Sequence, residues 1–264
     1  MSPPPGRAPR LLVESGLVGE GFAVVAGVDE VGRGALSGPV TVGVVLIGAD
    51  QGRPPRGLRD SKLLTPAARR ALVPRIQRWV SAWAVADASA AEIDEIGLIA
   101  ALRLAGHRAL AGLAQPPDCV LLDGNHDYLT PPGAGGGTEA LLSVFPVPFP
   151  HVRTLIKADL RCASVAAASV LAKTTRDAYM TGLAADHHEY GWEVNKGYAT
   201  PAHRDALRRV GPSPYHRLSW RLGVDDFGAG DELDLAAWGP EPGQDGALIL
   251  LDRNLLDRNQ EVRT

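Results

Sequence analysis

The segment Val25–Pro39 constrains this chain more than any other, because an apolar run ends there in two adjacent carboxylates and a glycine-rich turn. Residues 22–28 and 40–47 have the composition of buried strands, so the residues between them are predicted to form the loop of a β-hairpin. Side chains alternate between the faces of a strand, so Asp29 and Glu30 point the same way only where the strand ends. The pattern predicts one carboxylate on the core side, where it can bind a metal directly.

The turn that follows, Gly32-Arg33-Gly34, places a guanidinium between two glycines. Glycine reaches positive φ without steric strain, so such a turn lets the main chain come close to a ligand's hydroxyl or phosphate group. An ordinary polar hairpin turn explains the same residues without any ligand. Both interpretations stay open on this segment alone.

Composition indicates an ordinary globular protein and excludes several functional classes. Of the 264 residues, 45% are hydrophobic and 22% charged, which is enough for one substantial core. The chain has no run of about 18 apolar residues, and its first ten residues are Pro-rich, so we expect a cytoplasmic protein that does not contact membranes. Cys119 and Cys162 are too few for a disulfide framework or a thiolate metal site.

Charge is unevenly distributed along the chain. Residues 225–264 contain ten Asp and Glu against three Arg, a net charge of −7, whereas residues 1–224 carry 20 acids against 24 Lys and Arg, a net charge of +4. A basic body with an acidic tail is typical of a nucleic-acid enzyme, although chance asymmetry in a tail gives the same numbers. We expect a flexible N-terminal arm at 1–21 that includes a short helix packed on the body, a catalytic body at 22–224 and an acidic tail at 225–264.

Capping signals and periodicity predict the remaining elements. The Thr65-Pro66 pair and the Ser89-to-Glu92 capping box each indicate a helix start, and Thr200-Pro201 indicates another. The expected helices are 66–79, 89–113, a long small-residue helix that opens at 157–159 and includes 162–173, and one from Pro201; the expected further strands are 80–86, 119–122 and 152–156.

Two further carboxylates follow these predicted elements. Asp123 comes at the carboxyl end of the apolar run 119–122, and ligands of open α/β sheets bind at such strand ends. It is therefore a candidate partner for Asp29. Asp159 lies in the first turn of a predicted helix, where the helix dipole favours an acidic residue even without a metal. Asp127 is expected to be solvated.

Several polar residues are candidates for phosphate contacts. Ser61 and Lys62 stand before a predicted helix start, where a hydroxyl and an ammonium can hold a phosphate. Tyr198 lies on a predicted turn, as a packing lid or as a substrate contact. Other residues either contact phosphate or have a plainer role as solvated or anchoring groups: Lys157, Lys173, Arg176, His216 and Arg217.

Six segments in one order resemble ribonuclease HII and span about residues 22–222. They are 29–34, 60–62, 122–124, 157–159 with 164–169, 197–200 and 213–217. The resemblance implies a ribonuclease H-like α/β fold, with a mixed five-stranded sheet of three antiparallel and then two parallel strands, flanked by helices, and a small C-terminal helical portion. Only about 20 residues precede the first strand, so the N-terminal substrate-binding domain of ribonuclease HIII is not expected.

The resemblance also implies a function. It implies an endonuclease that hydrolyses the RNA strand of RNA–DNA hybrids and cuts 5′ of ribonucleotides embedded in duplex DNA, in replication and ribonucleotide removal. The implied ligands of two divalent ions are Asp29, Glu30, Asp123 and Asp159. Hard oxygen ligands without a Cys or His cluster favour Mg²⁺ or Mn²⁺ over Zn²⁺.

The resemblance further implies how the substrate is recognised. The main chain of Gly32-Arg33-Gly34 would read ribose 2′-hydroxyls, and Tyr198 would stack under the sugar at the RNA–DNA junction. The full set of expected substrate contacts is Gly32, Arg33, Gly34, Ser61, Lys62, Ser164, Arg176 and Tyr198. We expect the enzyme to act as a monomer, and no motif assigns a role to the acidic tail.

Two other classes of protein stay open. A DNA nuclease of the same general fold, such as a resolvase, would cleave pure DNA, and the Gly-Arg-Gly turn together with Tyr198 argues against it. A non-catalytic module that binds hybrids would leave all four carboxylates dispensable.

Overall fold

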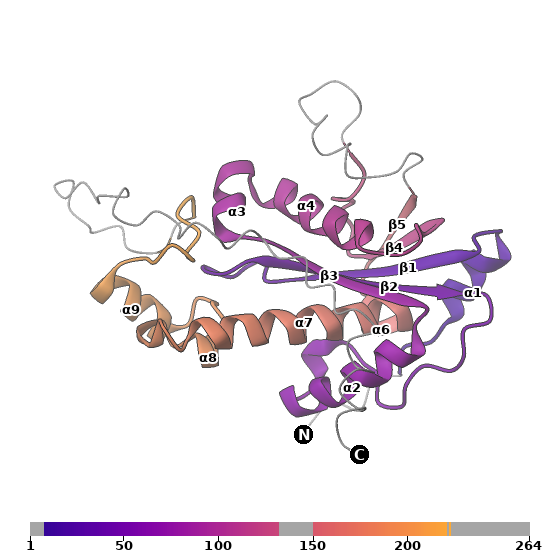
Figure 1. Cartoon of the computed structure of the whole chain (residues 1–264), viewed down its shortest axis with the longest axis horizontal. Helices are drawn as coiled ribbons and strands as arrows, with labels where there is room; N and C mark the ends of the chain where they lie inside the picture. The colour runs from indigo at the N-terminus through magenta and orange to yellow at the C-terminus, as the bar shows by residue number, and fades with distance from the viewer. Residues whose placement is uncertain (1–7, 132–149, 221, 223–264) are drawn as a thin grey trace, which may run out of the picture.

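The computed structural model describes residues 8–131, 150–220 and 222, and shows them as a central sheet between two layers of helices (Figure 1). In this part of the chain the sheet has the strand order β3-β2-β1-β4-β5. The strands are β1 (Val24–Val31), β2 (Val40–Gly48), β3 (Ala82–Ala88), β4 (Cys119–Asp123) and β5 (His151–Leu155). Strands β1, β2 and β3 pair antiparallel, whereas β4 and β5 join parallel to β1. The predicted mixed sheet is confirmed.

Strand β1 extends beyond its apolar run. It was expected to end at Val28, but Asp29 pairs with Gly43 and Glu30 with Val42, so the ladder to β2 continues to Val31. The side chains therefore still alternate at the two carboxylates. Long-range pairing with β2 overrides the local composition here.

Helix α7 (Ala163–Leu183) covers one face of the sheet, against β1 and β2 (Figure 1). Its small residues let it approach very closely: a Cβ on Gly27 would lie 2.4 Å from the carbonyl carbon of Ser164, and one on Gly43 would lie 2.5 Å from the Ala168 oxygen. Helix α2 (Pro66–Trp79) packs on the outer side of α7, with Thr65 as its predicted N-cap.

Helices α3 (Ala90–Ile96) and α4 (Leu98–Ala111) lie on the opposite face of the sheet, and α4 contacts β2 and β3 (Figure 1). The predicted capping box is confirmed, because the Ser89 hydroxyl and the Glu92 carboxylate each accept the other residue's N–H. A single helix over 89–113 was wrong. Gly97 has a φ of +78°, which breaks the helix into two.

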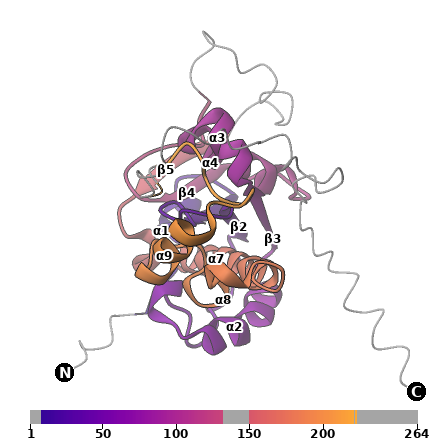
Figure 2. The same cartoon turned by 90° about the vertical axis from the view of Figure 1, so that its left-hand side faces the viewer.

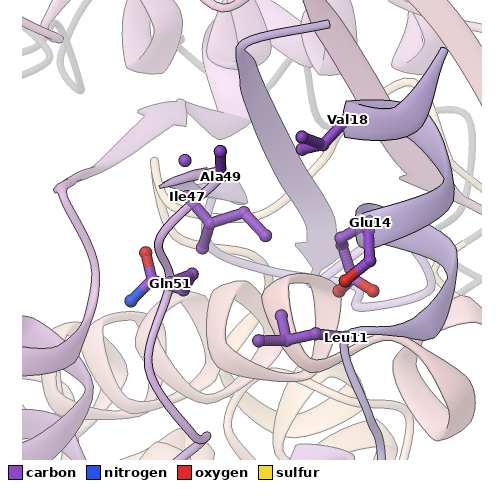
Figure 3. A pocket seen from close by; sticks show the side chains of 8 residues that line it. Leu11, Glu14, Val18, Ile47, Ala49 and Gln51 are labelled. Atoms are coloured by element: carbon purple, nitrogen blue, oxygen red, sulfur yellow. The ribbon is translucent and has the colours of Figure 1, made fainter. Parts of the chain in front are cut away.

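Helix α1 (Leu12–Gly19) corrects the boundary of the N-terminal arm. The short packed helix is confirmed, but a flexible arm over 1–21 is wrong for this stretch, since Glu14 and Leu17 are buried. One carboxylate oxygen of Glu14 accepts hydrogen bonds from the Ser164 N–H at 2.9 Å and its hydroxyl at 2.8 Å. Figure 3 shows Glu14 beside a cavity of about 80 Å³ between α1 and the end of β2.

The predicted helix from Lys157 is divided in two. The short helix α6 (Ala158–Arg161) ends at Cys162, whose backbone is extended, and α7 begins at the next residue. At the far end of α7, the short helices η2 (His188–Tyr190) and α8 (Trp192–Asn195) and helix α9 (Pro201–Val210) form a smaller cluster (Figure 2). The predicted start of α9 at Pro201 is confirmed. This cluster is the expected C-terminal helical portion.

Some expectations fall on other parts of the chain. The acidic tail at 225–264 lies outside the described residues. No helix in the described ranges is long and apolar enough to cross a membrane.

Candidate active site

The sheet brings Asp29 and Asp123 together. Val28 pairs with Leu122 in the parallel β1–β4 ladder, so the next residue on each strand is a carboxylate at the same edge of the sheet. Asp159 arrives from α6, directly after β5. The proximity predicted for Asp29 and Asp123 follows from this register, because parallel strands end side by side.

Asp123 also positions Asp159. One Asp123 oxygen accepts the N–H of Ala158 at 2.7 Å and that of Asp159 at 3.4 Å, which caps the first turn of α6. Lys157 before this turn has a φ of +59°, a left-handed conformation that is uncommon for a residue with a side chain. The chain therefore turns sharply between β5 and α6, and this turn brings Asp159 close to the other carboxylates.

Asp29 and Glu30 point to opposite faces of β1. Asp29 is buried on the α7 side, where it hydrogen-bonds with Ser169, and Glu30 meets the hydroxyl of Tyr128 at 3.4 Å on the other side. The prediction that one carboxylate of the pair faces the core is confirmed. The Arg33 guanidinium lies 3.7 Å from Glu30.

The carboxylates raise one another's proton affinity. Burial raises the pKa of Asp29 well above its usual range, and the Glu30 and Asp123 charges raise it further, against a hydrogen bond from Ser169. Burial and the Asp123 charge likewise raise the pKa of Asp159. Burial also raises the pKa of Glu30, although Arg33 opposes the shift. Like charges held in a partly desolvated site create a strong local demand for cations.

The donor set is chemically suited to a hard divalent cation. Every candidate ligand is a carboxylate, and oxygen ligands are those that Mg²⁺ and Mn²⁺ prefer. As the side chains lie, no three His, Cys, Asp or Glu residues within the described ranges form a ready coordination cluster. Asp123 instead binds backbone N–H groups, and the Lys62 ammonium lies 3.5 Å from Asp159. Joint coordination therefore requires side-chain rotations, which the attraction of the carboxylates to a bound cation would drive.

Tyr128 is a residue of this site that sequence reasoning missed. Its side chain is fully buried, and burial followed by the Glu30 and Asp29 charges raises its pKa well above the usual value. Asp127 was expected to be solvated, but its carboxylate accepts the N–H groups of Leu129 and Thr130. It closes the turn that carries Tyr128, and no sequence motif indicated this.

A second loop presents Lys62. Asp60 accepts the N–H of Lys62 at 3.0 Å, and the hydroxyls of Ser61 and Ser169 hydrogen-bond at 2.7 Å. Burial by itself lowers the pKa of Lys62, but the carboxylates of Asp29, Asp60 and Asp159 raise it above its usual value. The ammonium group therefore stays charged beside the carboxylates.

Arg69 is another residue that the sequence did not single out. Its guanidinium donates to the carbonyls of Ser61 at 2.9 Å and Leu64 at 3.2 Å and pairs with Asp177 on α7. It thereby fixes the loop that carries Lys62. Arg69 also lines a groove of about 690 Å³ between α2, α7 and α8, together with Arg70, Lys173 and Lys196.

The Gly-Arg-Gly turn packs against a buried arginine. Gly32 has a φ of +88°, and a Cβ there would lie 2.2 Å from the Arg176 side chain, so only glycine is tolerated. Arg33 and Gly34 are exposed. The Tyr198 ring is half-buried and has Lys173 and Arg176 within 6 Å of its centre, at 5.8 Å and 5.6 Å.

Two of the expected substrate contacts need correction. The side chains of Ser164 and Arg176 are fully buried, so neither presents a surface to a ligand. Ser164 binds Glu14, and Arg176 donates to the carbonyls of Pro39, Lys196 and Ser37. Their motif positions did not indicate this burial, because it depends on how helix α7 packs.

Comparison with known proteins agrees with this geometry. The family model described as Ribonuclease HII matches residues 26–223. Ribonuclease HII of Streptomyces avermitilis is 49% identical over 200 residues, which cover 76% of this chain and 78% of the relative. The Paracoccus denitrificans protein of that name is 45% identical and covers 80% of this chain and 91% of its own length.

Solved structures show the same fold. Ribonuclease H2 from Pyrococcus horikoshii OT3 superposes with a TM-score of 0.58 at 27% identity, covering 76% of this chain and 96% of that one. The RNase HII chain in a PCNA:RNase HII complex from Archaeoglobus fulgidus gives 0.56 at 25% identity, covering 74% and 93%. Sequence, fold and the convergence of carboxylates at one sheet edge agree, and the chain belongs to the ribonuclease HII family of metal-dependent endoribonucleases.

Proposed function

We propose that this enzyme hydrolyses the RNA strand of RNA–DNA hybrids and cuts 5′ of single ribonucleotides in duplex DNA, with two Mg²⁺ or Mn²⁺ ions bound by Asp29, Glu30, Asp123 and Asp159. The observation that carries the proposal is the meeting of these carboxylates, which come from β1, β4 and α6 and in which neighbouring charges help to raise the pKa values of Asp29, Glu30 and Asp159. Repulsion within such a cluster destabilises the fold until cations neutralise it, so the cluster favours a bound metal.

The bound cations would supply an activated water and charge stabilisation at the leaving oxygen. The chain's own residues orient the metal ligands and select the substrate. Asp123 fixes the turn that carries Asp159, and Tyr128 restrains one oxygen of Glu30. The Lys62 ammonium is placed to attract a substrate phosphate to the carboxylate cluster.

The exposed Gly-Arg-Gly turn and the Tyr198 ring support selection of ribose. The buried Arg176 links the two segments, because it donates to the carbonyls of Ser37 and Lys196 and lies beside the Tyr198 ring. A main-chain turn can require a 2′-hydroxyl without requiring a base sequence, because it touches the sugar and not the base edges. The basic groove lined by Arg70, Lys173 and Lys196 supports a path for the nucleic-acid backbone.

Replacement of one carboxylate tests the metal assignment. We expect Asp29→Asn to abolish cleavage of a duplex with a single ribonucleotide while the metal-free protein keeps or gains thermal stability, since one like charge is removed. Mg²⁺ should raise the melting temperature of the unaltered protein and raise it much less for the variant, because a ligand stabilises only the state that binds it.

The matched control is Asp205→Asn, at an exposed Asp on α9 that pairs with Arg208. It should leave both cleavage and the Mg²⁺-induced rise in melting temperature unchanged. Turnover by Asp29→Asn close to that of the unaltered protein would contradict the metal assignment. Cleavage of an all-DNA duplex by the unaltered protein would favour the alternative DNA nuclease.

A further inference from the structure

Arg217 binds the inner side of the Gly-Arg-Gly turn. Its guanidinium donates to the carbonyls of Gly32 at 2.6 Å and Arg33 at 3.0 Å, and also to those of Gly38 and Pro39 at distances of 3.1 Å to 3.2 Å. The side chain is fully buried. A planar guanidinium has five N–H donors, so one side chain can hold several converging carbonyl groups.

No carboxylate among the described residues forms an ion pair with this arginine. Within the described residues neither Arg217 nor Arg176 takes part in an ion pair, and all their hydrogen bonds go to main-chain carbonyls. Burial, and then repulsion from Arg176, lowers the pKa of Arg217 to about 9. The guanidinium is therefore still charged at neutral pH, and the peptide dipoles of the turn compensate it together with the Trp220 ring, whose centre lies 4.8 Å from the guanidinium carbon.

The geometry of the peptide group determines the outer side of the turn. In a trans peptide the C=O and the following N–H point in opposite directions. Because the Gly32 and Arg33 carbonyls point inward to Arg217, the N–H groups of Arg33 and Gly34 point outward. Both residues are exposed, and neither N–H hydrogen-bonds within the described part of the chain.

We propose that Arg217 is a positioning residue for ribose recognition, which aims the N–H groups of Arg33 and Gly34 at an oxygen of the substrate sugar and polarises them. A charged donor on a carbonyl strengthens the hydrogen bond that the same peptide's N–H can make, because linked hydrogen bonds polarise one another. The two N–H groups form a small concavity for an oxygen acceptor. This inference rests on the proposed function, since it specifies how that site would select its sugar.

Other contacts join the turn to Tyr198 as one unit. The Gly197 carbonyl accepts the N–H groups of Leu36 and Ser37, and the Arg217 N–H donates to the Leu36 carbonyl. Arg176 links the Ser37 carbonyl to that of Lys196, two residues before the ring. The donors of the turn and the face of Tyr198 are therefore held in a fixed relation, as recognition of a single sugar requires.

The test measures sugar selectivity in binding. In an Asp29→Asn background with Mg²⁺, the dissociation constants for a duplex with one ribonucleotide and for the same all-DNA duplex give a preference ratio. We expect Arg217→Lys to lower this ratio at least about tenfold while affinity for all-DNA changes little, since lysine keeps the charge but cannot hold both carbonyls. Arg108→Lys is the matched control, because Arg108 donates to the Asp87 carbonyl on the opposite face of the sheet.

Several outcomes separate the two proposals. An unchanged ratio in a folded Arg217→Lys protein overturns the role of Arg217, whereas an unaltered enzyme that does not cleave the ribonucleotide duplex overturns the proposed function itself. If Arg217→Lys does not fold, NMR signals of backbone amides test the inference in the Asp29→Asn protein, which keeps Arg217. The Arg33 and Gly34 amide signals should shift with the ribonucleotide duplex and much less with all-DNA, and equal shifts overturn the inference.

Discussion

At the scale of single residues, buried polar side chains fix the positions of several groups in this site. Tyr128, Arg69 and Arg217 touch no predicted ligand, yet each fixes a carboxylate, a loop or a turn that does. A buried polar group is stable only when its hydrogen bonds are satisfied, so each of these side chains determines the conformation of its partners. Substitution of any of these buried residues should therefore lower activity, even though the side chain itself is not at the surface.

Tyr198 is the half-buried residue whose role is most easily tested. If its ring stacks under the sugar at an RNA–DNA junction, Tyr198→Ala should lose more activity on a single-ribonucleotide duplex than on a long hybrid, where many sugars share the contact. We expect a loss of about tenfold to a hundredfold on the former, from a stacking contact of ~1–3 kcal/mol. Steady-state kinetics on both substrates is the measurement, and an equal loss on both would make Tyr198 a packing residue.

A pair of buried histidines makes the stability of the protein depend on pH. His203 donates to the Tyr198 carbonyl at 2.9 Å and lies 3.1 Å from His216, whose other nitrogen accepts the Ser213 N–H. Burial, and then the neighbouring His203, lowers the pKa of His216 to about 3. The unfolded chain has a histidine pKa of about 6.5, so below that pH it binds more protons than the folded chain.

We expect His216 to make the protein acid-sensitive. As pH falls from 7 to 5, this group should lower the free energy of unfolding by about 2 kcal/mol, because the folded pKa is depressed. Urea unfolding at both pH values should show a smaller loss for His216→Asn than for the unaltered protein. His126→Asn, at an exposed position, is the control and should keep the original slope. Equal slopes in all three proteins would contradict the assignment to His216.

At the scale of elements, the close packing of α7 on β1 and β2 brings the site together. Glycines on the strands and small residues on the helix let the backbones approach, and Ser164 and Ser169 thereby reach Glu14 and the loop of Ser61. Helix α7 thus connects α1 to the loop that carries Ser61 and Lys62. A larger side chain at this interface would move α7 as a whole, since interiors are close-packed.

Gly27→Ala tests this interface. The added Cβ would lie 2.4 Å to 2.5 Å from backbone and side-chain atoms of Ser164, so the free energy of unfolding should fall by about 1–3 kcal/mol or more. Gly16→Ala in α1 is the matched control, because a Cβ there meets nothing within 4 Å. It should be neutral or stabilising by about 0.5–1 kcal/mol. Chemical denaturation measures both, and a neutral Gly27→Ala would show that α7 can shift freely.

At the scale of the whole molecule, charge separates the body from the tail. Residues 1–224 carry a net charge of +4 and residues 225–264 a net charge of −7. The body thus attracts a phosphate backbone, while the tail can compete with that backbone for the same basic surface. The competition should weaken with salt, since the Debye length is only about 10 Å at 0.1 M ionic strength.

Removal of residues 225–264 should tighten binding to an RNA–DNA hybrid at low salt, and the gain should shrink as salt rises. Dissociation constants of both chains at two salt concentrations measure the effect. A matched full-length variant in which the tail's acids are replaced by Asn and Gln should behave like the truncated chain, because charge alone is at issue. Unchanged affinity at low salt would contradict competition by the tail, and lost thermal stability would point to apolar tail residues docked on the body.

Much of the fold and the four carboxylates could be predicted from the sequence. Caps such as Ser89 and Thr65 and the apolar strands are local features, and each is encoded within a few neighbouring residues. Interruptions at Gly97 and Cys162 were not foreseen, because a helical periodicity continues across them. The proximity of Asp29 and Asp123 could be expected because each follows an apolar strand, whereas the register that aligns Val28 with Leu122 is a property of the folded sheet.

Only the tertiary structure decided which polar residues are buried and what they hold. From the sequence, Arg176 and Arg217 could be cations on the surface. In the structure both are fully buried and donate to main-chain carbonyls. Contacts such as Glu14 to Ser164 join residues 150 positions apart. The sequence determines which groups are available, whereas burial and partner choice arise from packing that no local pattern contains.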